Sequence, residues 1–330
     1  MRKSLAVLAS VLAAVISTRT ITLAQPSSRL LVLNKEDATL AIVDPVAGSI
    51  LGRVPVGQGP HELVVSTDGR LAFASNYGTG AAPGQTISMV DIAAHKELRR
   101  IDVSPLRRPH GLAFANGKLY FTAEANRKIA RYDPATDKID WEFETGQNGT
   151  HMVLPTADAK ILFTSNIGSN SVSAIQQAED GSWTQAVIPV GKGPEGIDLS
   201  PDGKTVWSAH SQDGGVSLID VATRKVRQTI EAGTKRSNRI RLTPDGKLAL
   251  ITDIDTGELA VIDTAARKVV RRLSLGRSPE GVLIPPGAQA TMAYVAVNGD
   301  NHVAVIDLKT WQVTKKISTG TGPDGMAWKP

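Results

Sequence analysis

The feature that most constrains this chain is a short phrase that recurs seven times at nearly constant spacing. The copies GPHEL, RPHGL, GTHMV, GPEGI, RSNRI, SPEGV and GPDGM begin at Gly59, Arg108, Gly149, Gly193, Arg236, Ser278 and Gly322. Successive copies lie 49, 41, 44, 43, 42 and 44 residues apart. A fixed period of this length is typical of repeat architectures, in which each repeat forms one small supersecondary unit.

Each full repeat contains four β-rich runs separated by turn signals. The repeat after Pro194 reads GIDLS, KTVWSAH, GVSLID and KVRQTIEAG, and the turn Pro201-Asp202-Gly203 separates the first two runs. In such a turn Pro presets φ, Asp bonds its own backbone and Gly accepts a positive φ. Four short antiparallel strands at this period are typical of a propeller blade. A helical solenoid would need a 3.6-residue apolar period, which is absent. The sequence therefore predicts an all-β, seven-bladed β-propeller.

The two ends of the chain supply different parts of one repeat. The C-terminal phrase PDGMAWKP provides only a first strand, whereas RLLVLN, TLAIVD and SILGRVPVG near the N-terminus provide a second, third and fourth strand. We therefore expect a composite blade made of residues 324–328 and 29–56. Ring closure of this kind removes exposed strand edges that would otherwise invite aggregation.

Residues 1–24 have the pattern of a signal peptide. Arg2 and Lys3 precede an apolar run, Leu5–Ile16, and small residues precede Gln25. The run is shorter than the roughly 20 residues that span a bilayer. An uncleaved interfacial anchor is the alternative. We expect a signal peptide over residues 1–24, one propeller domain over residues 25–330, and a location in the periplasm or outside the cell, with no transmembrane segment.

Composition narrows the classes of partner. Without residues 1–24 the net charge falls from +5 to +2, and aromatic residues make up only 4% of the chain. Because nucleic-acid binding relies on basic grooves and stacking aromatics, we consider it unlikely here. The chain has no Cys, so a protein outside the cytoplasm must rely on its core and on ring closure. We expect a monomer.

Two further phrases carry a family resemblance. Second-strand runs end in Ser75-Asn76, Ser165-Asn166 and Val297-Asn298, and third-strand runs end in Ile219-Asp220, Ile262-Asp263 and Ile306-Asp307. These residues resemble the YVTN-type propeller repeat family over essentially the whole chain after residue 24. The resemblance implies a periplasmic or secreted, lactonase-like seven-bladed propeller, and similar propellers include lactonases, the streptogramin lyase and nitrous oxide reductase. The chain lacks the full set of seven His that the copper cluster of the last requires.

Repeat registration predicts two concentric rings of side chains at one mouth of the channel. The residue before each first-strand apolar run gives an inner ring of His61, His110, His151, Glu195, Asn238, Glu280 and Asp324. The ends of the second strands give an outer ring of Asn34, Asn76, Glu124, Asn166, His210, Asp253 and Asn298. Because neighbouring strand residues face opposite ways, only one of His61 and Glu62 can face a shared site, and we expect it to be His61.

The inner ring concentrates histidine. Three of the six His in the chain, His61, His110 and His151, share its register on consecutive blades. Imidazole is a ligand for Zn²⁺ and other divalent metals, so these three could hold one metal ion that polarises a carbonyl or activates water. The alternative is a polar rim whose side chains meet solvent or one another.

These observations leave two functions open. The first is a protein that binds a small molecule, a glycan or another protein through the rim residues, to which His210, Glu124, Asn76 and Asn166 of the outer ring would contribute. The second is a metal-dependent lyase or lactone hydrolase centred on the three His; whether the chain is an enzyme therefore stays open. A Gly-rich insertion over Tyr77–Gln85 is either a lid or a tolerated surface loop. The Asp residues that end third strands, such as Asp44 and Asp220, are expected to form Asx turns.

Overall fold

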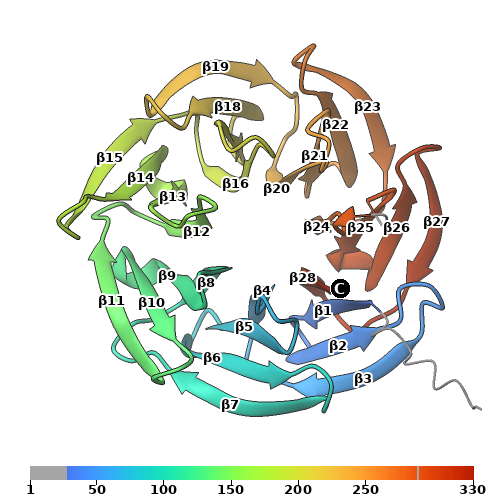
Figure 1. Cartoon of the computed structure of the whole chain (residues 1–330). Coiled ribbons are helices and arrows are strands. Elements are labelled where there is room, and N and C mark those ends of the chain that lie inside the picture. Colours follow the sequence, from blue (N-terminus) through green and yellow to red (C-terminus); the bar gives the residue numbers. More distant parts are fainter. Residues whose placement is uncertain (1–27, 288–289) are drawn as a thin grey trace, which may run out of the picture.

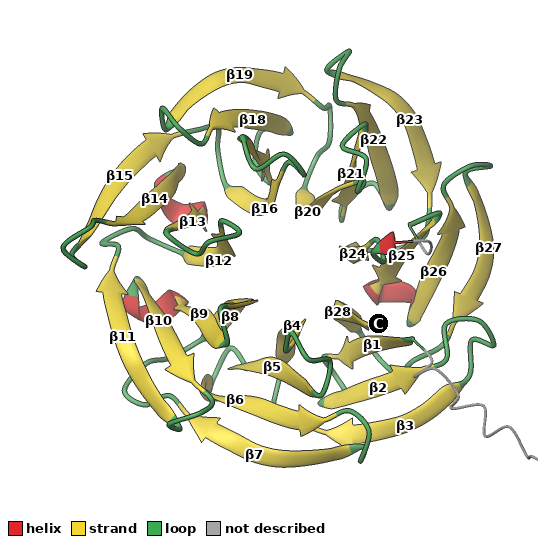
Figure 2. Ribbon diagram, viewed as in Figure 1, coloured by secondary structure: helices red, strands yellow, loops and turns green. Residues whose placement is uncertain are grey.

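Seven four-stranded antiparallel sheets form a ring around a central channel in the computed structural model, which describes residues 28–287 and 290–330 (Figures 1 and 2). The predicted seven-bladed propeller is confirmed. We number the blades along the ring from the composite one. Blade 1 contains β28 (Pro323–Lys329), β1 (Arg29–Asn34), β2 (Thr39–Val43) and β3 (Ile50–Pro55). The predicted leader over residues 1–24 lies outside the described residues.

The other six blades each use four consecutive strands, ordered from the channel outward. Blades 2 and 3 contain β4 (Pro60–Val65), β5 (Leu71–Gly78), β6 (Pro83–Asp91) and β7 (Lys96–Asp102), then β8 (Pro109–Ala115), β9 (Lys118–Ala123), β10 (Lys128–Asp133) and β11 (Lys138–Glu144). Blades 4 and 5 contain β12 (Thr150–Pro155), β13 (Ile161–Asn166), β14 (Ser171–Gln177) and β15 (Trp183–Pro189), then β16 (Pro194–Leu199), β17 (Thr205–His210), β18 (Gly215–Asp220) and β19 (Lys225–Glu231).

Blades 6 and 7 complete the ring. They contain β20 (Ser237–Leu242), β21 (Leu248–Asp253), β22 (Glu258–Asp263) and β23 (Lys268–Ser274), then β24 (Pro279–Leu283), β25 (Met292–Val297), β26 (His302–Asp307) and β27 (Gln312–Ile317). Short 3₁₀ turns follow three of the second strands: η1 (Glu124–Asn126), η2 (Ile167–Ser169) and η4 (Asn298–Asp300). No helix in the described part of the chain is long and apolar enough to cross a membrane.

The ring closes as the sequence predicts. β1 pairs with β28 along their length, with Leu30 opposite Trp328 and Val32 opposite Met326. The amide of Lys35 donates to the carbonyl of Gly322 over 2.8 Å. The first and last strands therefore lie side by side in one blade, which leaves no innermost strand unpaired at the seam (Figure 1).

The core lies between the blades and is mainly aliphatic. Leu31, Leu33 and Ile42 of blade 1, for example, pack with Leu63 and Ala74 of blade 2. Because each blade lies between two others, its inner strands are buried on both faces, and β1 and β13 are buried along almost their whole length. This explains why the inner strands are apolar without strict alternation.

The Asp residues that end third strands have the structural role predicted for them. Asp44 Oδ1 accepts hydrogen bonds from the amides of Val46 and Ala47, each at 2.9 Å. The same bond type follows Asp91, Asp133, Asp220, Asp263 and Asp307. These carboxylates hold the turns between third and fourth strands, away from the channel mouth.

A bulge interrupts every innermost strand at the inner-ring residue, which is the third residue of the recurring phrase. In β4, Pro60 pairs with Asn76 and Leu63 with Ala74, so His61 and Glu62 together lie opposite Ser75. The same shift occurs in the other six blades. A bulge of this kind breaks the alternation of side chains and bends the strand. It therefore turns the inner-ring residue toward the channel in each blade.

Candidate functional site at one mouth of the channel

All seven predicted inner-ring residues line one cavity of about 200 Å³ at the mouth of the channel. The blades contribute, in ring order, Asp324, His61, His110, His151, Glu195, Asn238 and Glu280. Most of these side chains are buried: Asp324 is 1% exposed, His110 2% and Asn238 6%. The repeat register and the bulge together gather seven side chains from distant parts of the sequence.

The second layer of the cavity comes from a different register than the sequence indicated. Tyr77 and Lys35 line the cavity, and each stands one residue beyond the outer-ring position, Asn76 or Asn34. Ile254 does the same in blade 6. In a strand the neighbouring residue points the other way. In these three blades, the residue that follows the predicted outer-ring position faces the ligand space, and the outer-ring residue itself does not.

Glu124 also lies in this second layer. Its predicted place in the outer ring was wrong by one residue. Pro109 pairs with Ala123, as Pro60 pairs with Asn76, so Glu124 corresponds to Tyr77. Asn298 of blade 7 is displaced in the same way, since Pro279 pairs with Val297. In both blades a 3₁₀ turn begins at the displaced residue. The structure thus brings Glu124 to the cavity, although for a different reason than the alignment indicated.

The structure does not place Asn76, Asn166 or His210 at the cavity. Asn76 Oδ1 accepts from the amide of Gly57 over 3.0 Å, and its Nδ2 donates to Thr86 Oγ1 over 2.9 Å. His210 Nδ1 lies 2.9 Å from Asp213 Oδ1. Asn166 bonds Ser171 and Ser173 of the same blade. These buried side chains hold the ends of strands within their own blades.

Blades 2 to 4 form an aromatic wall that also contains the Glu124 carboxylate. The ring centroids of His110 and His151 are 3.7 Å apart, those of His61 and His110 are 5.2 Å apart, and those of His61 and Tyr77 are 4.7 Å apart. Burial lowers the pKa of His61 to about 4, against the attraction of Asp324. Burial, reinforced by the two neighbouring His, also lowers the pKa of His110 well below its usual value. His61 and His110 are therefore uncharged at neutral pH.

The stacked arrangement does not support the predicted three-His metal centre. The His110 and His151 rings are tilted by only 30° at this short separation, so they present faces to each other. Metal-binding nitrogens lie in the plane of the ring and must converge on one point. In residues 28–287 and 290–330 no group of three or more His, Asp or Glu is placed to hold a metal ion.

The opposite wall, from blades 5 to 7 and blade 1, is ionic. Lys35 Nζ lies 3.1 Å from Glu280 Oε2 and 3.4 Å from Asp324 Oδ2. Arg239 contacts Glu62 and lies 3.7 Å from Glu195 Oε1. Sequence reasoning missed both cations. The sequence signal for Arg239 was present, because it stands where GPEGI and SPEGV have Gly.

The pKa values of the two acids beside Lys35 differ in direction. Burial, together with the nearby charge of Asp324, raises the pKa of Glu280 to about 8. Burial also opposes ionisation of Asp324, but Lys35 and Arg239 outweigh it and lower the pKa of that carboxyl. At neutral pH Asp324 is thus ionised, whereas Glu280 retains a proton that it can donate.

The walls leave several buried polar atoms without partners. They are His110 Nδ1, His151 Nε2, Asn238 Oδ1 and Asp324 Oδ1. His151 Nδ1 and Glu124 Oε2 lie 3.5 Å from each other and are only loosely paired. All belong to residues that line the cavity. A buried polar atom that lacks a hydrogen bond costs free energy, about 1–3 kcal/mol, so such atoms usually meet water or a ligand. Their clustering marks this cavity as the candidate site.

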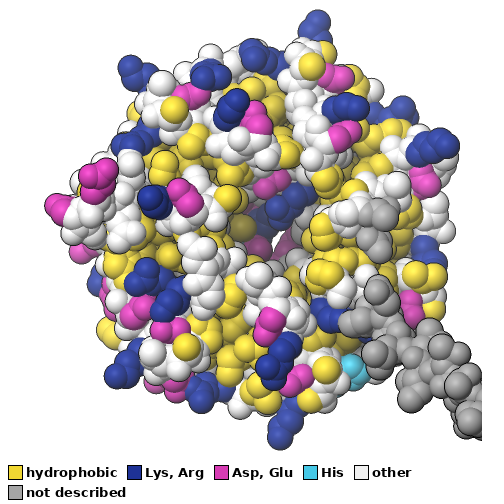
Figure 3. Space-filling model, in the orientation of Figure 1, with side chains coloured by type: hydrophobic (Ala, Val, Ile, Leu, Met, Phe, Trp, Pro, Cys, Tyr) yellow, Lys and Arg dark blue, Asp and Glu magenta, His cyan; other side chains and the backbone are white. Residues whose placement is uncertain are grey.

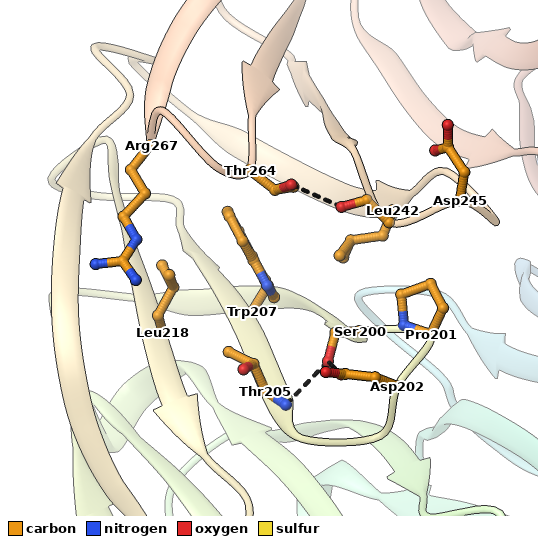
Figure 4. Close-up of a pocket in the computed structure, with 11 residues that line it drawn as sticks. Ser200, Pro201, Asp202, Thr205, Trp207, Leu218, Leu242, Asp245, Thr264 and Arg267 are labelled. Carbon is orange, nitrogen blue, oxygen red and sulfur yellow. Dashed lines mark hydrogen bonds between the residues drawn. The ribbon is translucent and has the colours of Figure 1, made fainter.

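A larger cavity of about 370 Å³ between blades 5 and 6 lacks this property (Figure 4). Trp207 and Leu242 line its apolar side, and Asp202 and Asp245 stand at its edge. Both carboxylates are already used in turns, where Ser200 donates to Asp202 and Thr243 donates to Asp245, each over 2.6 Å. None of its lining residues has a buried polar atom without a partner. The cavity at the channel mouth is therefore the stronger candidate.

Solved structures share this architecture at low sequence identity. Hydrazine synthase of Kuenenia stuttgartiensis is 19% identical over 89% of this chain and 99% of that one, with a TM-score of 0.74. The periplasmic gluconolactonase PpgL of Pseudomonas aeruginosa is 19% identical over 92% of this chain and 99% of that one, with a TM-score of 0.74. The dihydro-heme d1 dehydrogenase NirN is 16% identical over 94% and 77%, with a TM-score of 0.66. At these identities the likeness shows the fold alone.

A family model gives a more specific result. No curated protein matches this chain. The model of the YNCE-like β-propeller matches residues 112–289, more than half of the chain. The resemblance to lactonase-like seven-bladed propellers is confirmed by this match together with the solved structures. The chain belongs to the YNCE-like β-propeller family.

Proposed function

We propose that this propeller binds a small, hydroxyl-rich molecule in the mouth cavity, and that it works in the periplasm or outside the cell. The observation that carries the proposal is the set of unpartnered atoms on His110, His151, Asn238 and Asp324, beside the loose contact of His151 with Glu124 at 3.5 Å. Neutral imidazoles both donate and accept, whereas the carboxylate and amide oxygens only accept. A ligand with several hydroxyl groups satisfies both kinds, because each hydroxyl donates and accepts.

The size of the cavity favours a small molecule over a glycan chain or a protein. Its volume is about 200 Å³, below the roughly 300–1,000 Å³ typical of sites for drug-sized ligands. A monosaccharide or a sugar acid is the class that fits both this volume and the donor–acceptor pattern.

A second candidate, lactone hydrolysis, is favoured by one acid–base pair. His61 Nδ1 lies 2.8 Å from the carbonyl of Gly59, which can only accept, so the neutral ring carries its proton there and leaves Nε2 as a base. Glu280 holds a proton on the same cavity. His61 would take a proton from the attacking water, whose oxygen bonds to the lactone carbonyl, and Glu280 would protonate the ring oxygen as the ring C–O bond breaks. The structurally similar PpgL is a periplasmic gluconolactonase, which makes a sugar lactone the first substrate to try.

One titration series tests the binding function. Isothermal calorimetry with glucose, gluconate, myo-inositol and glucono-δ-lactone should show 1:1 binding of at least one probe. Asn238→Ala, which removes an unpartnered acceptor, should weaken it about tenfold. Asn148→Ala, an exposed loop residue outside the cavity, is the matched control and should bind as the unaltered protein does. Absence of binding to all four probes would overturn the proposal.

The lactone arm of the same series separates binding from catalysis. Proton release from glucono-δ-lactone, followed against the spontaneous rate with and without EDTA, should be accelerated and then lost in Glu280→Gln and His61→Asn if the chain is a lactonase. Loss on EDTA treatment alone would instead return the metal-dependent form of the hypothesis. Binding without acceleration would leave the binding function standing and exclude hydrolysis of this lactone.

A further inference from the structure

The residue after each inner-ring position is glycine in four blades. These are Gly111, Gly196, Gly281 and Gly325. A Cβ at Gly111 would lie 2.5 Å from the carbonyl oxygen of His151 in the next blade, and one at Gly325 would lie 2.1 Å from that of His61. Neighbouring innermost strands approach so closely here that a side chain has little room. The exceptions are Glu62 in blade 2, Met152 in blade 4 and Arg239 in blade 6.

Two of the exceptions meet across the channel. The guanidinium of Arg239 donates to the Glu62 carboxylate, although blades 2 and 6 are not neighbours in the ring. Only 11% of the Arg239 side chain and 14% of the Glu62 side chain are exposed. Since their strands belong to non-adjacent blades, this ion pair spans the channel and does not lie within one wall.

The ion pair lies on the deep side of the cavity. Glu62 and Arg239 each stand one residue farther along the innermost strand than the inner-ring residues His61 and Asn238. Arg239 lines the cavity, whereas Glu62 does not. Figure 3 shows one face of the ring, with acidic and basic side chains visible within the central opening. Arg239 thus supplies a charged side chain to the cavity lining, and its partner Glu62 lies just beyond that lining.

We propose that the Glu62–Arg239 pair determines ligand size: it closes the channel beneath the mouth cavity and restricts the site to one monosaccharide-sized unit. This inference rests on the proposed function. The pair acts as a plug because both ends are anchored on opposite strands and Arg239 is held by a second acid, Glu195, at 3.7 Å. A longer ligand would have to break this ion pair to extend down the channel.

The test replaces the plug with the residue that the repeat uses elsewhere. In Glu62→Gly/Arg239→Gly, both positions carry the glycine found in blades 1, 3, 5 and 7. We expect the unaltered protein to bind gluconate and to bind lactobionate, which is gluconate extended by one galactose, at least tenfold more weakly. The double variant should bind both within about threefold of each other, as measured by calorimetry.

Two further variants test whether the effect comes from the volume of the two side chains, from their charges, or from a general loss of structure. Glu62→Gln/Arg239→Gln removes the charges but keeps most of the side-chain volume, so it should retain most of the size limit. Arg277→Ala/Asp300→Ala removes an ion pair of blade 7 outside the cavity, where Arg277 Nε lies 2.7 Å from Asp300 Oδ1, and should also retain it. Glu62→Ala/Arg239→Ala serves if the glycine variant does not fold, as judged by circular dichroism.

The outcomes distinguish the two proposals. Gluconate binding with an unchanged preference in the opened variant would overturn the role of the plug and leave the proposed function standing. Equal binding of both sugars by the unaltered protein would also overturn it. Failure of every variant and of the unaltered protein to bind either sugar would overturn the proposed function, and the size limit with it.

Discussion

Blades 2 to 4 line the mouth cavity with three imidazoles, a phenol and the single carboxyl group of Glu124, whereas blades 5 to 7 and blade 1 line most of it with acids and cations. In the histidine wall, His110 Nδ1 and His151 Nε2 have no partner, and in the ionic wall one oxygen each of Asn238 and Asp324 has none. In the ionic wall, Lys35 and Arg239 are already engaged by carboxylates. The comparison teaches that buried polar side chains have two roles in this one cavity. Open hydrogen-bonding capacity recognises a ligand, and closed ion pairs shape and support the space around it.

If this division is right, removing a cation from the ionic wall should have the largest effect on stability. Lys35→Met leaves Glu280 and Asp324 buried without their cation, so we expect a loss of about 3 kcal/mol in the free energy of unfolding at pH 8. The loss should shrink at pH 5, because the carboxyl groups can then take up protons. Urea denaturation followed by fluorescence measures both values.

The control for this variant is an ion pair on the outer surface. Lys128 Nζ lies 3.0 Å from Glu142 Oε2, and both side chains are about one third exposed. Lys128→Met should therefore cost no more than about 1 kcal/mol. Equal losses in the two variants would show that the wall beside Lys35 is solvated and contributes no more than a surface pair.

The two walls should also respond to pH in opposite directions. The pKa of His61 is about 4 in the folded protein and 6.5 in the reference state, so the unfolded chain binds the extra proton and stability falls as pH drops from 6.5 to 4. The pKa of Glu280 is about 8 against 4.5, so the folded state holds the proton and stability falls as pH rises from 4.5 to 8. The effect of Glu280 should be the larger of the two, because its pKa lies farther from its reference value.

Stability measured from pH 4 to pH 9 by urea titration resolves the two contributions. His61→Asn should flatten the acid side of the profile, and Glu280→Gln should flatten the fall in stability between pH 4.5 and pH 8. The predicted opposite responses would be wrong if His61→Asn changed the slope between pH 4.5 and pH 8 or Glu280→Gln changed the slope on the acid side. They would also be wrong if both variants kept the pH dependence of stability of the unaltered protein.

The smallest effect is expected in the histidine wall. His110 is buried and uncharged, and its Nδ1 has no partner. His110→Leu removes no hydrogen bond through that atom, so we expect a change within about 1 kcal/mol. His210→Leu is the matched control: it removes the contact with Asp213 at 2.9 Å and should cost more. A loss for His110→Leu as large as that of Lys35→Met would show that the histidine wall is itself a structural network.

Much of the architecture could be read from the repeat. Its period predicts the blades, the split terminal repeat predicts the pairing of β1 with β28, and the phrase register predicts the seven inner-ring positions that line the cavity. The outer ring was less predictable. Glu124 and Asn298 looked equivalent to Asn76, yet each lies one residue beyond the paired position. A one-residue slip reverses the direction of a side chain, so the second layer of the cavity could not be assigned from the alignment.

The sequence by itself determined the number of blades, the way in which the ring closes and the concentration of His on three consecutive blades, because each of these follows from local strand and turn signals repeated at a fixed period. Only the tertiary structure decided which charges meet. Lys35 and Glu280 are 245 residues apart, and Glu62 and Arg239 are 177 residues apart. Ion pairing depends on distance in space: the contact of His110 with His151 requires two neighbouring blades to pack, and the Glu62–Arg239 pair requires strands on opposite sides of the channel.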